Sequence, residues 1–138
     1  MEIVLVNTCR VINAKGGTEK VFCDMANALD AMGHNVTAVC LDDKKGMPGF
    51  PISDSVQFIN AKGCENPIYC RGLLKKIRAF SLNRDERRRR RREIECSWNA
   101  KLLRKAIENI EHVDICVSFQ PETTYLLSRL QCLAAPII

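Results

Sequence analysis

Short apolar runs alternate along the chain with stretches in which apolar residues recur three or four positions apart. Continuous runs rich in β-branched residues are typical of strands buried on both faces of a sheet, and the helical spacing predicts amphipathic helices. The runs predict strands at residues 3–6, 36–41, 56–59 and 113–119, and the start of a fifth strand at 136–138. The helical spacing predicts helices at 19–32 and 72–79, from about 84 to 110, and at 122–133.

The first predicted helix has recognisable signals at both ends. Thr18 is the expected N-cap residue, and Glu19 suits the positive end of the helix dipole. Gly33 stands where a left-handed residue commonly follows a helix. A strand, a helix and a second strand at this spacing form one βαβ unit, for which a right-handed crossover is expected.

The alternation of strands and helices predicts an α/β fold, namely a Rossmann-like, mostly parallel sheet with helices on both faces. With 138 residues, the chain has the length of a single domain, 1–138. Apolar residues continue to the last position, so we expect the chain to be a truncated half of a longer protein.

Two further features bear on the compartment. No apolar run approaches the roughly 20 residues of a membrane-spanning helix, and no signal peptide precedes the first strand, so we expect a cytoplasmic protein. The 8 cysteines include no C-x-x-C pair. They are expected to be buried, reduced thiols, with no metal site and no cofactor.

Positive charge is concentrated in one segment. Residues 71–105 hold 14 Lys and Arg against 4 Asp and Glu, a net charge of +10, whereas the remaining 7 basic and 12 acidic residues give −5. A basic helical segment of this density indicates a polyanion or membrane surface. The arginines in question are Arg84, Arg87, Arg88, Arg89, Arg90, Arg91 and Arg92. The alternative is a solvated run with no partner.

Two loops could carry ligand chemistry. Gly16, Gly17 and Thr18 lie between a strand and a helix, where free N–H groups and the helix dipole favour an anion. The sequence matches neither G-x-x-x-x-G-K-[ST] nor G-x-G-x-x-G, so a plain tight turn is the alternative.

The second loop follows the fourth predicted strand, at the same edge of the sheet. Its polar side chains can hydrogen-bond sugar hydroxyls or phosphate oxygens. The candidates are Ser118, Phe119, Gln120, Glu122 and Thr123. The alternative is a polar N-cap loop in which Pro121 starts the helix. No Ser-His-Asp or Cys-His arrangement follows from the spacing, so the catalytic residues stay unknown.

The two ends of the chain resemble the N-terminal domain of GT-B glycosyltransferases of family four. The resemblance rests on the turn Gly16-Gly17-Thr18-Glu19 and on the stretch from Leu29 through Gly33-His34-Asn35-Val36-Thr37. It rests also on Val113-Asp114-Ile115-Cys116-Val117-Ser118-Phe119, which is similar to the family's fourth strand. Residues 42–105 hardly contribute to it.

The resemblance implies a retaining hexosyltransferase built from two Rossmann-like domains. The N-terminal domain binds a lipid-linked or glycan acceptor, and its Gly-Gly turn, here Gly16 and Gly17, reaches the diphosphate of the nucleotide-sugar donor. Such enzymes act in polysaccharide or glycolipid biosynthesis, often as peripheral proteins at the inner face of the membrane. The 138 residues alone are then expected to be inactive, and could pair as a homodimer through an exposed cleft face.

A second function class is also compatible with the sequence. A non-catalytic α/β module could bind nucleic acid through its arginine-rich segment. Aromatic residues that would stack on bases do not interleave with the arginines, which argues against single-stranded nucleic acid. The glycosyltransferase interpretation includes no nucleic-acid partner.

Overall fold

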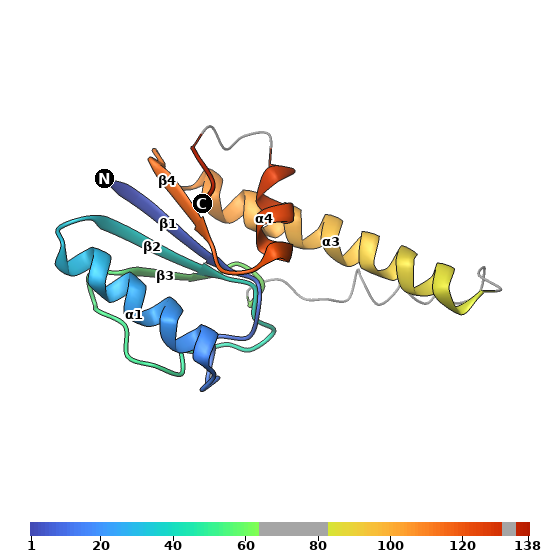
Figure 1. The fold of residues 1–138 in the computed structure, drawn as a ribbon, viewed down its shortest axis with the longest axis horizontal. Helices are drawn as coiled ribbons and strands as arrows, with labels where there is room; N and C mark the ends of the chain where they lie inside the picture. Colours follow the sequence, from blue (N-terminus) through green and yellow to red (C-terminus); the bar gives the residue numbers. More distant parts are fainter. Residues whose placement is uncertain (64–82, 131–134) are drawn as a thin grey trace.

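The computed structural model describes residues 1–63, 83–130 and 135–138 of the chain. Four parallel strands form its sheet in the order β3-β2-β1-β4 (Figure 1). These strands are β1 (Glu2–Asn7), β2 (Asn35–Cys40), β3 (Gln57–Asn60) and β4 (Ile115–Ser118). In this register Val4 of β1 lies between Thr37 of β2 and Cys116 of β4. The α/β, Rossmann-like fold expected from the sequence is confirmed.

Helices cover both faces of this sheet, as predicted. They are α1 (Gly17–Ala31), α3 (Arg84–Glu108) and α4 (Pro121–Ser128). Alternate residues of β1 point to opposite faces, so Leu5 joins the core beneath α1, whereas Val4 joins the core beneath α3 and α4. Phe22 of α1 and Leu103 of α3 fill the two cores and are completely buried.

The predicted boundaries need several corrections. Helix α1 is capped by Gly16 and not by Thr18, because Gly17 is already helical while Gly16 keeps an extended backbone with φ −106° and ψ 173°. The structure confirms the glycine signal at the other end, where Gly33 has φ +84°. Two backbone hydrogen bonds close this end, from Gly33 N to Asp30 O and from His34 N to Leu29 O, at 2.9 and 3.2 Å.

Strand and helix lengths near the C-terminal side also differ from expectation. Strand β4 is shorter than 113–119, and β3 begins one residue later than predicted. Helix α4 includes Pro121 and ends at Ser128. Part of its predicted extension, 131–134, and the whole of the predicted helix 72–79 lie outside the described residues. At the predicted start of a fifth strand, Ile137 forms a single parallel bridge with Cys116, and no further strand is formed within the described residues.

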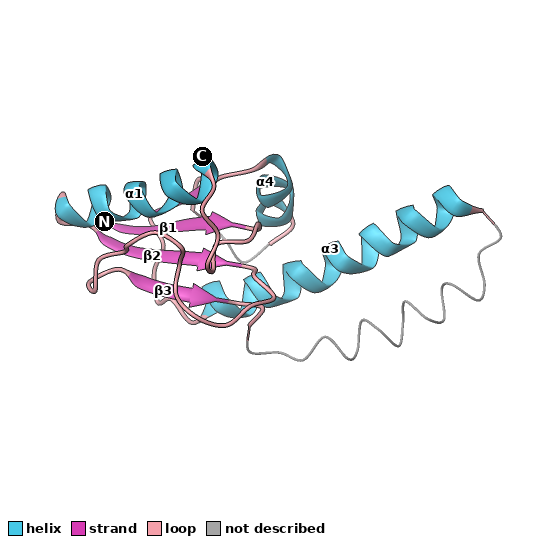
Figure 2. Ribbon diagram, turned by 90° about the horizontal axis from the view of Figure 1, so that it is seen from below, coloured by secondary structure: helices cyan, strands magenta, loops and turns pink. Residues whose placement is uncertain are grey.

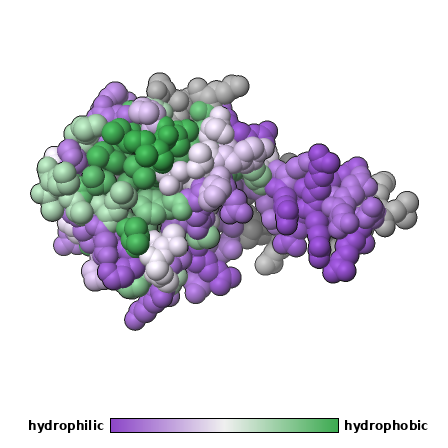
Figure 3. Space-filling model, viewed as in Figure 1, coloured by the Kyte–Doolittle hydropathy of each residue, from purple (hydrophilic) through white to green (hydrophobic). Residues whose placement is uncertain are grey.

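Helix α3 extends well beyond the sheet. Its 25 residues span about 37 Å at 1.5 Å per residue, and its N-terminal half projects away from the domain (Figure 2). All its buried residues belong to the C-terminal half, namely Leu102, Leu103, Ala106 and Ile107. The projecting half presents a hydrophilic surface (Figure 3). None of the described helices is long and apolar enough to span a bilayer.

Candidate functional site

The strands run parallel, so their carboxyl ends meet at one edge of the sheet. Asn7, Cys40, Asn60 and Ser118 are the last residues of β1, β2, β3 and β4. Ligands of open α/β sheets bind outside these ends, which makes this edge the first place to search for a site.

Asp42 fastens the loop after β1 to the end of β2. Its carboxylate Oδ2 accepts hydrogen bonds from the backbone N–H groups of Val11 and Ile12, both at 2.9 Å, and Oδ1 accepts from Lys44 N at 2.9 Å. Burial by itself raises the pKa of Asp42, but the hydrogen bonds from Lys44, Ile12 and Val11 outweigh it, so the pKa is lowered. An ionised, saturated carboxylate therefore holds this side of the edge.

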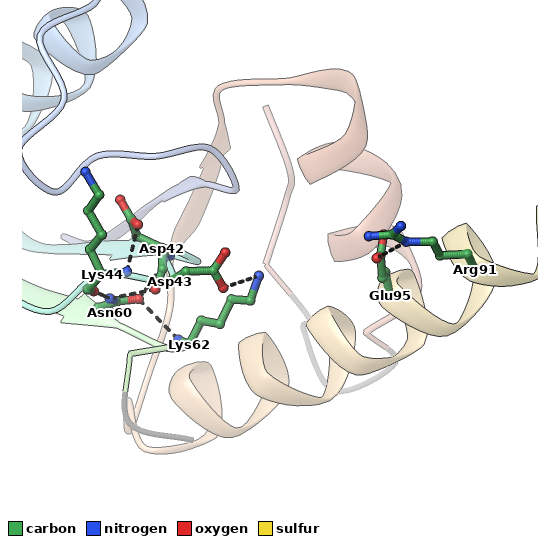
Figure 4. Close-up of polar contacts among 7 residues, drawn as sticks. All are labelled: Asp42, Asp43, Lys44, Asn60, Lys62, Arg91 and Glu95. Atoms are coloured by element: carbon green, nitrogen blue, oxygen red, sulfur yellow. Dashed lines mark hydrogen bonds and ion pairs between the residues drawn. The ribbon is translucent and has the colours of Figure 1, made fainter. Parts of the chain in front are cut away.

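Asn60 completes the same network from the end of β3 (Figure 4). Its side chain accepts from the backbone N of Asp42 and of Lys62, and it donates to the backbone O of Asp42 and of Lys44. A salt bridge between Lys62 and Asp43, 2.8 Å long, lies beside it. The side-chain polar groups on the β2–β3 side of the edge are therefore engaged by the protein itself.

The β4 side of the edge has an open cavity of about 660 Å³. Its lining is formed by the end of β4 and by α4: Ser118, Phe119, Gln120, Pro121, Thr124, Tyr125 and Ser128. Three of the five predicted acceptor contacts, Ser118, Phe119 and Gln120, are therefore brought together. Hydroxyl and amide groups of this kind can donate to and accept from sugar hydroxyls.

The other two predicted acceptor contacts lie elsewhere. Glu122 is exposed in the first turn of α4 and does not line the cavity. Thr123 is fully buried, and its hydroxyl lies 2.9 Å from the hydroxyl of Thr8. Thr8 in turn donates to Gln120 Oε1 at 3.2 Å. Thr123 and Thr8 thus support Gln120 without lining the cavity, and sequence reasoning missed the contribution of Thr8.

The Gly-Gly turn is open to solvent. Gly16, Gly17 and Thr18 are exposed, and no side chain caps the N-terminus of α1. The carboxylate of Glu19 lies where a Cβ on Gly16 would stand, whereas a Cβ on Gly17 would meet no atom within 4 Å. An anion at this turn therefore competes with Glu19 and has free space beside Gly17.

An aromatic contact links α1 to the cavity at the end of β4. Phe22 of α1 meets Phe119 edge to face, with ring centroids 5.1 Å apart. Among the described residues, no hydrogen bond or ion pair joins the Gly-Gly turn directly to Ser118 or Gln120. The two predicted loops share the edge but form separate parts of it.

The seven predicted arginines lie on the projecting half of α3, and their environments differ. Three have carboxylate partners one turn away: Arg89 with Glu93, Arg90 with Glu86 and Arg91 with Glu95. The Arg91–Glu95 pair, visible in Figure 4, is 2.8 Å long, and this hydrogen bond raises the pKa of Arg91. Within the described part of the chain, no ion pair involves Arg84, Arg87, Arg88 or Arg92.

Other expectations concern cysteines and metals. Cys23, Cys40 and Cys116 are buried, and burial raises the pKa of Cys40 and of Cys116 to about 12. Cys9 is exposed, against expectation, and its thiol lies 3.1 Å from Gln120 Oε1. The described residues contain no cluster of three or more His, Cys, Asp or Glu that could hold a metal ion.

No protein-family model matches the chain, and no curated protein matches it either.

Proposed function

We propose that the chain is the acceptor-side domain of a retaining GT-B glycosyltransferase. The observation that carries this proposal is the cavity at the end of β4, which Ser118 and Gln120 line at the carboxyl edge of a parallel sheet. Both side chains also hydrogen-bond within the chain, Ser118 with Thr124 and Gln120 with Thr8, so an acceptor would share or replace these bonds. These groups would orient the acceptor, a lipid-linked or glycan hydroxyl compound.

The Gly-Gly turn supplies the second part of the proposal. The uncapped N-terminus of α1 presents backbone N–H groups and the positive end of the helix dipole. Gly17 leaves the space for the diphosphate of a nucleotide-sugar to approach these groups closely, once the Glu19 carboxylate moves aside. In this arrangement the donor sugar would be bound mainly by a second domain across the cleft.

The chemistry proposed is group transfer at the anomeric carbon. The acceptor oxygen forms a bond to the anomeric carbon, and the bond between that carbon and the diphosphate oxygen of the donor breaks. The nucleoside diphosphate leaves with the bonding electron pair and the negative charge. The hydroxyl proton passes to a base that we do not assign within this chain. The arginines of α3 would hold the enzyme peripherally at an anionic membrane surface, on the cytoplasmic side, where lipid-linked acceptors are presented.

The test is transferase activity of the full-length protein with a panel of nucleotide-sugars and a lipid-diphosphate sugar acceptor. Substitution Gly17→Val places a side chain in the space proposed for the diphosphate, and we expect at least a tenfold loss of kcat/KM. The fold should persist, because a Cβ on Gly17 meets no atom within 4 Å and its φ is not in the left-handed region.

The matched control is Ala28→Val, which adds the same branched side chain to an exposed position further along α1. It should leave kcat/KM within about twofold of the wild type, because substitutions of exposed residues remote from the chemistry have small effects. Equal activity of the folded Gly17→Val enzyme would contradict the donor role of the turn. Absence of transfer with every sugar in the panel would contradict the proposed function itself.

A further inference from the structure

A second cavity, of about 510 Å³, lies between α3 and α4 and is lined by arginines of α3 and by one arginine at the end of α4. Arg88, Arg89 and Arg92 come from α3, and Arg129 follows directly after α4. Two carboxylates, Asp85 and Glu93, also line it, and Glu93 pairs with Arg89 at 3.4 Å. The balance of the lining is therefore positive.

The helical period explains why several of the α3 residues that line the cavity share one face of the helix. Asp85, Arg88, Arg92 and Cys96 follow one another at intervals of three or four residues along one face of α3. The same interval leads on, through positions 99 and 100, to Leu103, which is fully buried in the core. The face of α3 that packs on the sheet in the C-terminal half of the helix thus carries Arg88 and Arg92 in the N-terminal half.

The arginines of this face differ in pairing from those beside it. Arg90 and Arg91, which do not line the cavity, have carboxylate partners one turn away at 2.6 and 2.8 Å. Within the described residues, Arg88 and Arg92 form no ion pair. Like charges one helical turn apart repel each other, so a face of this kind favours an anion that neutralises it.

Arg129 is held in place from the opposite side of the cavity. Its guanidinium donates to the Tyr125 hydroxyl at 3.2 Å and lies over the ring, 5.7 Å from the centroid. Tyr125 also lines the cavity at the end of β4. The two cavities are therefore neighbours, one on each side of this tyrosine.

We propose that the cavity between α3 and α4 binds a diphosphate group through Arg88, Arg92 and Arg129. Guanidinium groups form paired hydrogen bonds with phosphate oxygens, and three of them lining one cavity from two sides match the several oxygens of a diphosphate. The volume of 510 Å³ is within the usual range for ligand cavities. The assignment of this group to the acceptor rests on the proposed function, since the neighbouring cavity would then hold the acceptor sugar.

The experiment compares two double variants in the complete chain. Arg88→Gln with Arg92→Gln removes two cavity arginines, and Arg90→Gln with Arg91→Gln removes two arginines of the same helix that do not line the cavity. Binding of inorganic pyrophosphate and of farnesyl diphosphate is measured by calorimetry at about physiological ionic strength. We expect at least a tenfold weaker affinity in the cavity variant and no more than a twofold change in the control.

A third variant tests whether the guanidinium group of Arg129 donates paired hydrogen bonds to the diphosphate. Arg129→Lys keeps the charge but loses the paired hydrogen bonds, and we expect an affinity between those of the wild type and the cavity variant. Thermal unfolding verifies that each variant is folded. Removal of the unpaired arginines should not lower the melting temperature, whereas the control loses two helix ion pairs and should melt slightly lower.

The outcomes distinguish a lipid headgroup from a free diphosphate, and they test the diphosphate site separately from the proposed transferase function. Much tighter binding of farnesyl diphosphate than of pyrophosphate identifies a lipid headgroup, and equal binding identifies a free diphosphate; both support the site. Equal weakening of diphosphate binding by the two double variants would overturn the site, as would absence of diphosphate binding by the wild type. Selective diphosphate binding in a protein without transferase activity would refute the proposed function alone.

Discussion

The two sides of the carboxyl edge of the sheet differ in how the polar groups at the strand ends are arranged. On the β2–β3 side, Asp42 and Asn60 saturate one another and the surrounding backbone. On the β4 side, Ser118 and Gln120 line a cavity of about 660 Å³. Both sides belong to one parallel sheet, so strand direction does not explain the difference.

The length of the connections does explain it. Residues 8–16 follow β1 and residues 41–56 follow β2, and these two long loops are bonded to each other, for example by the Ile12–Pro48 bridge. After β4 only Phe119 and Gln120 precede Pro121, the first residue of α4. Long loops fill the edge with their own polar groups, whereas a short connection leaves the strand end accessible to a ligand. The cavity at the end of β4 thus lies beside two loops that are hydrogen-bonded to each other.

The largest expected effect concerns the contact between the two long loops. Gly49 N donates to Val11 O at 3.0 Å, and a Cβ on Gly49 would overlap the backbone of Ala14. Since backbone atoms cannot rotate away as a side chain can, Gly49→Ala should lower the free energy of unfolding by about 3 kcal/mol. Urea denaturation measures this loss.

Gly17→Ala is the matched control for that substitution, because it adds the same methyl group at a position with no atom within 4 Å. It should leave the stability unchanged or slightly higher, since alanine is the better helix former. If Gly49→Ala were as stable as Gly17→Ala, the two loops would not be in close contact at Gly49, and the packing described for this side of the edge would be wrong.

A smaller effect is expected from Asp42→Asn. The amide keeps one acceptor oxygen but turns an N–H₂ group towards backbone N–H donors, so we expect a loss of about 1–3 kcal/mol at pH 7. Chemical denaturation of both proteins measures the difference. An unchanged stability at pH 7 would show that the three hydrogen bonds to Asp42 do not fasten the loop.

The same pair of proteins has a predicted pH dependence. Because the pKa of Asp42 is lower in the folded chain, the unfolded chain binds its proton more readily. The stabilisation is therefore fully present above the unfolded pKa of about 3.9, and it is lost as the pH falls below that value through the folded pKa. The difference between wild type and Asp42→Asn should shrink at pH 3 relative to pH 7.

Much of the fold could be predicted from local patterns, because they reflect burial directly. The apolar runs of β1 and β2 lie in central strands, and Gly33 ends α1 as its conformational freedom predicts. The predicted N-cap of α1 was wrong. Threonine is a common N-cap residue, but the chain already has helical geometry at Gly17, one residue before Thr18. Strand ends depend on pairing partners that the local sequence does not contain.

The site was only partly predictable, for a related reason. Ser118 and Gln120 follow a strand, so the rule for carboxyl ends predicts them, and the same rule applied after β1 would also have found Thr8. The partners of Asp42 are some 30 residues earlier in the chain. The pairing of Arg90 with Glu86 is local to α3, whereas the position of Arg88 opposite Arg129 depends on where α4 packs.

The smallest expected effect is on the hollow side of the edge and completes the comparison. Asn60→Ala removes a side chain with four hydrogen bonds to backbone groups, and we expect it to cost about 1–3 kcal/mol. Ser118→Ala removes a half-buried hydroxyl that lies 2.6 Å from the hydroxyl of Thr124. Thr124 is exposed, so water can hydrogen-bond its hydroxyl in the variant. Its cost should stay below about 1 kcal/mol, and urea denaturation of the two variants in parallel measures the contrast. A loss for Ser118→Ala as large as that for Asn60→Ala would mean that the end of β4 is as firmly bonded as the ends of β2 and β3. The polar groups at the end of β4 would then stabilise the fold, and they would no longer support a ligand site in this cavity.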